Sequence, residues 1–78
     1  MHNKIQIKAF WDSDALVWVA ESDDVPGLIT EAETMEKLID KLHILIPELL
    51  QENEMLSTEL QEIPFDLHSE RKETVRCG

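Results

Sequence analysis

A row of leucines in the middle of this 78-residue chain limits the folds that it can adopt. The row and its neighbours recur with helical spacing, and they are Leu38, Ile39, Leu42, Leu45, Ile46, Leu49 and Leu50. Such a wide apolar stripe must be buried against another element. Thr34 is a good N-cap, and Glu36 in the first turn complements the helix dipole. The spacing therefore predicts a helix over about residues 35–53 that lies on a second layer of structure.

Pro47 lies inside this helical pattern. It has no backbone N–H and its ring clashes with the carbonyl of His43, so a kink or a break is expected there, at a cost of about 3 kcal/mol. The apolar stripe continues in phase through Leu49 and Leu50. This continuity favours one kinked helix over two separate helices.

The first half of the chain has the patterning of strands. Residues 4–11 alternate in polarity and predict a strand whose apolar face holds Ile5, Ile7, Ala9 and Trp11. An acidic turn follows, and residues 16–22 predict a second strand that returns as a hairpin. We expect Val17 and Val19 to continue the core face of this strand, although Trp18 between them makes the choice of face ambiguous.

Two further strands complete the expected sheet. Pro26 and Gly27 suit a type II turn, and residues 28–32 after it predict a short third strand. A last strand is expected over about 62–69, and the residues toward 76 either extend it or form a frayed tail. Pro64 cannot donate to a ladder, so this strand should lie at an edge or begin there. The prediction is one α+β domain over 1–78, with an antiparallel-rich sheet and the long helix on one face.

The charge of the chain limits its ligands. It has 17 acidic and 7 basic residues, for a formal net charge of -10. This charge repels phosphate, so direct nucleic-acid binding is disfavoured and a basic protein is the natural partner. The alternative is that the charge only keeps a small domain soluble. No signal peptide and no apolar run of membrane-spanning length is visible, so we expect a cytoplasmic protein.

The order of the turns and strands carries a family resemblance. The segments that carry it are 10–14 (FWDSD), 18–22 (WVAES), 24–34 (DVPGLITEAET) and, after the helix, 62–67 (EIPFDL). From about Lys4 to Leu67 this series resembles the HicB-like antitoxin family, and most closely its short domains of unknown function. The resemblance implies a partial ribonuclease-H-like fold.

The resemblance also implies a partner. HicB-like antitoxins bind a basic HicA-like toxin, an mRNA interferase with a double-stranded-RNA-binding-like fold, and cover its catalytic surface. Many members carry a C-terminal DNA-binding segment, whereas only a short tail follows Leu67 here. The resemblance therefore leaves direct transcriptional autoregulation in doubt.

The candidate partner contacts are charged loop residues together with one aromatic anchor. They are Asp12, Asp14, Trp18, Asp23, Asp24, Glu31 and Glu33. The alternative for the aspartates is an ordinary solvated turn. For Trp18 the alternative is cross-strand packing against Trp11, which we favour over a role as a binding hot spot because a small domain needs its large apolar side chains.

Three functions remain open at this point. The leading prediction is a non-enzymatic antitoxin-type module that neutralises a HicA-like mRNA interferase by steric and electrostatic occlusion. The first alternative is a self-associating structural or regulatory domain, with a dimer as its oligomer, because an open edge strand invites a second copy. The second alternative, a metal-dependent nuclease remnant that uses loop carboxylates, is less favoured. The histidines His2, His43 and His68 match no metal-ligand spacing, and Cys77 has no base beside it, so we predict no catalytic residue, metal or cofactor.

Overall fold

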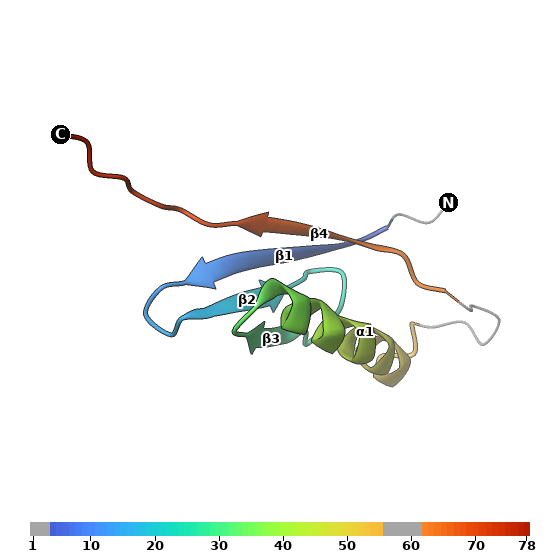
Figure 1. The fold of residues 1–78 in the computed structure, drawn as a ribbon. Coiled ribbons are helices and arrows are strands. Elements are labelled where there is room, and N and C mark those ends of the chain that lie inside the picture. Colours follow the sequence, from blue (N-terminus) through green and yellow to red (C-terminus); the bar gives the residue numbers. More distant parts are fainter. Residues whose placement is uncertain (1–3, 56–61) are drawn as a thin grey trace.

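One mixed sheet and one helix make up the computed structural model, which describes residues 4–55 and 62–78 (Figure 1). In chain order the elements are β1 (Ile5–Asp12), β2 (Val17–Glu21), β3 (Ile29–Ala32), α1 (Met35–Glu52) and β4 (Phe65–Glu70). The strands lie in the order β3-β2-β1-β4. The first three strands form an antiparallel meander, and β4 pairs parallel to β1. This arrangement confirms the predicted α+β class and the position of the last strand at an edge; the ribonuclease-H-like likeness stays a prediction.

Short-range hydrogen bonds hold the two turns of the meander. The Asp12 carboxylate accepts the backbone N–H groups of Asp14 and Ala15 at 3.0 and 3.1 Å. In the second turn Gly27 has a φ of 83°, and the backbone N–H of Leu28 donates to the Val25 carbonyl at 3.1 Å. A positive φ at the third turn position is the mark of a type II turn, which confirms the role predicted for Gly27.

The helix begins and continues as its sequence predicts. The Thr34 hydroxyl accepts the backbone N–H of Lys37 at 3.1 Å and so caps the first turn. The helix then runs for 18 residues with Pro47 inside it, which confirms one helix rather than two. It ends at Glu52, and the backbone N–H of the C-cap residue Asn53 donates to the Leu49 carbonyl.

The core lies between α1 and the sheet. On the helix it contains Leu38, Leu42, Ile46 and Leu50, and beneath them lie Ile7, Ala9, Ala20, Val25, Leu28 and Ala32. The strands thus present alanines at three of these positions, and small side chains let a helix approach a sheet closely.

The face that we expected β2 to bury is the wrong one. The register pairs Ala20 with Ala9 and Trp18 with Trp11, and directly opposed residues share a face. Trp18 and Ala20 therefore point toward the helix, whereas Val19 points the other way. Val17 is buried but lies apart from the core cluster.

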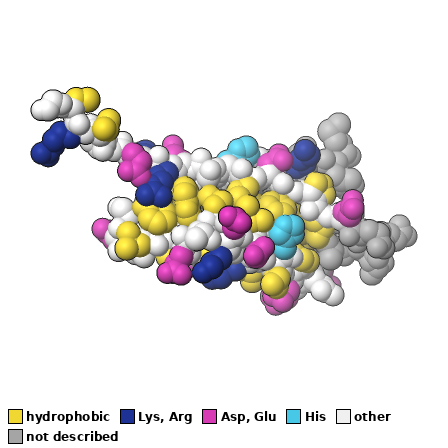
Figure 2. Space-filling view, viewed as in Figure 1, with side chains coloured by type: hydrophobic (Ala, Val, Ile, Leu, Met, Phe, Trp, Pro, Cys, Tyr) yellow, Lys and Arg dark blue, Asp and Glu magenta, His cyan; other side chains and the backbone are white. Residues whose placement is uncertain are grey.

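The helix covers only part of its face of the sheet, because it packs against β2 and β3. Over β1 and β4 the same face carries half-buried apolar side chains, and these are Ile5, Trp11, Phe65 and Leu67. Figure 2 shows hydrophobic side chains as a band along the molecule in this region, between α1 and β4. Beyond β4, residues 71–78 leave the body as an extended arm (Figure 1), and the longest dimension of the chain is 58 Å against 24 and 18 Å.

Candidate partner-binding surface

The face of the sheet opposite α1 combines apolar and acidic side chains. Strand alternation and register place these side chains on it: Gln6, Lys8, Phe10, Asp12, Val17, Val19, Glu21, Ile29, Glu31, Asp66, His68 and Glu70. We call this surface the open face, because no element within residues 4–55 and 62–78 packs over it. Phe10 is 41% exposed and Ile29 is 72% exposed.

One row of the open face crosses all four strands. The register aligns Glu31 on β3, Val19 on β2, Phe10 on β1 and Glu70 on β4. Two apolar side chains therefore lie between two carboxylates. An apolar centre with a charged rim is the usual layout of a protein-binding surface.

The open face is negative. Its carboxylates are Asp12, Glu21, Glu31, Asp66 and Glu70, and its only lysine is Lys8. Beside it, Lys4 Nζ lies 3.8 Å from an oxygen of Asp66. Carboxylates that outnumber cations on one surface attract a basic partner and repel phosphate.

Two of the predicted contact residues also bind the backbone. Asp12 holds the β1–β2 turn, as described above. Asp24 accepts the backbone N–H of Gln6 at 2.8 Å, while the Ser22 hydroxyl donates to the Gln6 carbonyl at 2.6 Å. These contacts occupy the edge of β1 where its pairing with β2 has ended. Part of the hydrogen-bonding capacity of Asp12 and Asp24 is thus used within the chain.

The structure does not gather all seven predicted residues into one patch. Asp14 lies in the β1–β2 turn, and Asp23 lies in the β2–β3 connection at the other end of the sheet. The five residues of β2 separate these two turns by roughly 16 Å, at about 3.3 Å per residue. Glu31 and Glu33 belong to the same end as Asp14, because β3 runs antiparallel to β2.

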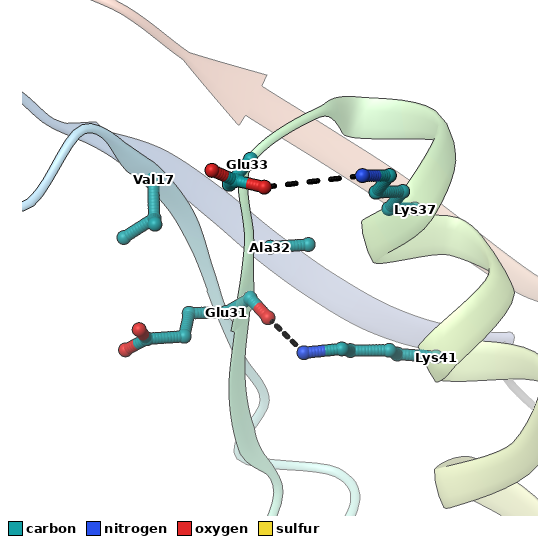
Figure 3. Close-up of a pocket in the computed structure, with 6 residues that line it drawn as sticks. All are labelled: Val17, Glu31, Ala32, Glu33, Lys37 and Lys41. Carbon is teal, nitrogen blue, oxygen red and sulfur yellow. Dashed lines mark hydrogen bonds and ion pairs between the residues drawn. The ribbon is translucent and has the colours of Figure 1, made fainter.

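Glu31 and Glu33 border a shallow pocket of about 210 Å³ between β3 and α1, which Lys37 and Lys41 complete (Figure 3). Glu33 pairs with Lys37 at 3.8 Å, and Lys41 Nζ donates to the backbone carbonyl of Glu31 at 2.5 Å. Figure 3 shows the carboxylate of Glu31 directed away from the helix. Lys41 therefore covers a carbonyl on the outer edge of β3 and leaves the Glu31 carboxylate available on the open face.

Trp18 lies on the helix side of the sheet. Its ring meets that of Trp11 edge to face, with centroids 5.5 Å apart, and it packs against the core cluster. The guanidinium of Arg71 lies 4.2 Å from the centroid of the Trp11 ring. Trp18 therefore contributes to packing, and it does not lie on the same face as Glu31.

Sequence reasoning missed the apolar part of the open face. Phe10, Val19 and Ile29 are absent from the predicted set, because that set was chosen by charge and loop position. The signal was present in the alternation, since Phe10 occupies the polar phase of residues 4–11. A single exposed aromatic residue is common, but together with Val19 and Ile29 on the same face it forms an apolar patch of the kind that partners cover.

The described residues give no indication of a metal site or a membrane span. Within the described part of the chain, no group of three or more His, Cys, Asp or Glu side chains is placed to hold a metal ion. Among those same residues, no helix has the length and apolar character that crossing a membrane requires.

Comparisons with known proteins identify the family. A search of curated proteins gave no match. Among solved structures, the chain is similar to the crystal structure of the hypothetical protein TTHA1013 from the extremely thermophilic bacterium Thermus thermophilus. The two share 45% identity with a TM-score of 0.70, over 96% of this chain and 100% of that chain. A family model described as a domain of unknown function, DUF1902, matches residues 4–77, and the chain therefore belongs to the DUF1902 family.

Proposed function

We propose that this protein is a non-enzymatic, HicB-like module that binds and neutralises a basic HicA-like mRNA interferase. The order of turns and strands that resembles HicB-like antitoxins supports the proposal, as does the formal net charge of -10. The interaction would take place in the cytoplasm, where an mRNA interferase meets its substrate.

The observation that carries the proposal is the row Glu31–Val19–Phe10–Glu70 on the open face. Phe10 and Val19 supply an apolar centre that a partner can desolvate. Glu31 and Glu70 at the two ends supply carboxylates for lysines or arginines of that partner.

Carboxylates on this face would replace RNA phosphates on the toxin. A surface that binds RNA presents Lys and Arg side chains to a phosphate backbone. The rows on either side of Phe10 add Asp12, Glu21 and Asp66 to the same negative field. The module would thus occlude the toxin by covering its RNA-binding face, and opposite charges would speed the encounter.

The test is complex formation with a small basic HicA-like protein encoded by the neighbouring reading frame. We expect the two proteins to co-purify, RNA cleavage by the toxin to stop at equimolar ratio, and the association rate to fall as salt rises. If the purified pair does not associate, or if cleavage continues in the complex, the proposal is wrong.

Two substitutions locate the interface. Phe10→Ala should weaken the complex by about tenfold or more, since buried aromatic anchors contribute more than 1 kcal/mol. Glu31→Lys should mainly slow association, because it reverses charge at the rim. The matched control is Asp14→Lys, which makes the same reversal in the β1–β2 turn and should have a smaller effect. Equal losses for Glu31→Lys and Asp14→Lys would show that net charge alone, and not the open face, drives binding.

A further inference from the structure

We propose that a second copy of this chain binds along the outer edge of β4, so that β4 and the arm of one subunit pair antiparallel with those of the other. The result is a symmetric dimer with one continuous sheet. The pairing would use the edge of β4 and the arm, whereas the toxin would cover the open face. Asp66 and Glu70 belong to both surfaces, and either proposal can hold without the other.

The outer edge of β4 is open. β4 pairs with β1 on one side, and no strand of the described residues lies on its other side. An edge strand leaves a row of N–H and C=O groups without partners, which is a template for another strand. The six residues of β4 make this edge longer than that of β3, which has four.

The arm, residues 71–78, continues from β4 as an extended segment that pairs with no strand of the described residues. All its residues are exposed, and Val75 is 83% exposed. Its only described side-chain contacts are those of Arg71 with Glu73 and with the Trp11 ring. Val75 and Cys77 are in the same phase as Phe65 and Leu67, with polar residues between them, so the apolar phase of β4 returns at the end of the arm.

Symmetry restricts the pairing to a few registers. Two identical edge strands related by a two-fold axis run antiparallel, and each residue faces one of the same phase. The helices of both subunits then lie on one face of the joined sheet.

With the axis at Arg71, the pairs are complementary. Leu67 faces the partner's Val75, and Phe65 faces the partner's Cys77. Glu70 faces the partner's Lys72. Two apolar pairs thus meet on the helix side, with Ser69 opposite the partner's Glu73 between them and the axis, and opposite charges meet on the open face.

The same register also places Asp66 opposite the partner's Arg76, which adds a second acid–base pair to each half of the dimer. At the axis itself, each Arg71 is directed onto Trp11 and Glu73 of its own chain, so the two guanidinium groups are drawn away from each other.

Neighbouring registers lose these matches. With the axis at Glu70, Leu67 would face a glutamate, the partner's Glu73, and His68 would face the partner's Lys72. With the axis at Lys72, the two Lys72 side chains would face each other, and Glu70 would face the partner's Thr74 instead of a lysine. A carboxylate against leucine in the first register and like charges in the second disfavour these arrangements.

The outer part of the helix face gives this dimer its apolar burial. Trp11, Phe65 and Leu67 are half-buried there; Phe65 and Leu67 pack against the border of the core cluster, where the His43 ring of α1 lies 5.8 Å from that of Phe65. The partner's Val75 and Cys77 would lie beside Phe65 and Leu67, on the side where each chain alone has solvent. The small size of the chain adds a reason for association, because about 78 residues bury a limited core.

Light scattering on the full chain is the first test. A wild-type mass near twice the 9.0 kDa of the chain is expected at about tens of micromolar, the range of a weak interface. Val75→Asp should leave only monomer, because it sets a carboxylate against the partner's Leu67. Val75→Ile is the matched control and should remain a dimer. Since Val75 is exposed in the single chain, neither substitution should change the circular dichroism of the monomer.

A charge exchange tests the register. Glu70→Lys and Lys72→Glu should each weaken the dimer by about tenfold, from two like-charge pairs of roughly 0.5–1 kcal/mol each. The double variant restores opposite charges across the interface and should recover most of the wild-type affinity. Failure of the double variant to recover would overturn the proposed register.

A disulfide provides the geometric test. In a Cys77→Ser background, Arg71→Cys places two cysteines opposite each other at the axis, within the Cα separation of about 4.4–6.8 Å that a disulfide needs. Glu73→Cys is the control, since the two copies would lie roughly 13 Å apart along the strands. Cross-linking of both variants alike, or a monomeric wild type, would overturn the dimer and leave the toxin proposal untouched.

Discussion

The two edge strands of this sheet, β3 and β4, differ in length and in how far the rest of the chain covers them. At β3 the edge is four residues long, the helix packs beside it, and Lys41 covers the Glu31 carbonyl. At β4 the edge is six residues long and continues into an extended arm, with no described side chain over its outer groups. Natural sheets protect edges with short strands and lysines, so β3 has the features of a closed edge and β4 those of a binding edge.

The difference follows from where the helix lies. α1 packs over β2 and β3, so its lysines reach the β3 edge while β1 and β4 keep half-buried apolar residues. The helix thus protects one edge and leaves the apolar side chains near the other edge half-buried.

The largest effect on the free energy of unfolding is expected when α1 is loosened from the sheet. Leu42 is fully buried between α1 and the sheet, so Leu42→Ala should lower the free energy of unfolding by about 3 kcal/mol. Urea denaturation followed by circular dichroism measures this loss. Ile44→Ala on the exposed side of the same helix is the control and should cost less than about 1 kcal/mol. Equal costs would mean that the leucine stripe does not hold the helix.

A smaller effect is expected at the point where the chain leaves β3 for the helix. Thr34→Ala removes the acceptor of the Lys37 N–H and should cost about 1 kcal/mol. Thermal unfolding compares it with Thr34→Ser, which keeps the hydroxyl and should stay near wild type. A stable Thr34→Ala variant would show that this first turn does not depend on its cap.

The contrast between the edges was partly visible in the sequence. Thr34, the leucine stripe and Pro64 act through neighbours a few residues away, so their patterns predicted the cap, the helix and an edge strand. In residues 17–20 every side chain is apolar, and alternation cannot choose a face. The choice depends on register with β1, which sets Ala20 against Ala9.

The candidate site was less predictable than the fold for a similar reason. Asp24 was predicted from charge and loop position alone, and the sequence did not indicate that its carboxylate accepts the N–H of Gln6, which lies 18 residues away. Such a contact depends on tertiary structure that loop composition does not encode. Phe10 shows the converse, because its place in the alternation indicated an exposed aromatic residue, and only the sheet shows that Val19 lies beside it.

Release of the arm that follows β4 should have a modest effect on the free energy of unfolding. Arg71→Ala removes the cation over the Trp11 ring and should cost about 0.5–1 kcal/mol at concentrations where the chain is monomeric. It should also change the tryptophan emission and speed cleavage at Lys72 by trypsin. Arg76→Ala is the control on the same arm and should leave the emission unchanged. Identical emission and stability for Arg71→Ala and wild type would mean that the contact with Trp11 does not hold the arm.

The smallest effect on stability, and the sharpest test of the contrast, is expected at Lys41. Lys41→Ala uncovers the Glu31 carbonyl, but water can replace the ammonium group at this exposed site, so the cost should be below about 0.5 kcal/mol. The consequence should appear in association, because β3 would then become a second open edge and chains could join at both ends of the sheet. Sedimentation at high protein concentration should show species larger than a dimer for Lys41→Ala and not for Lys41→Arg, which keeps a cation over the carbonyl. If Lys41→Ala sediments as wild type does, the shortness of β3 rather than its lysine keeps that edge closed.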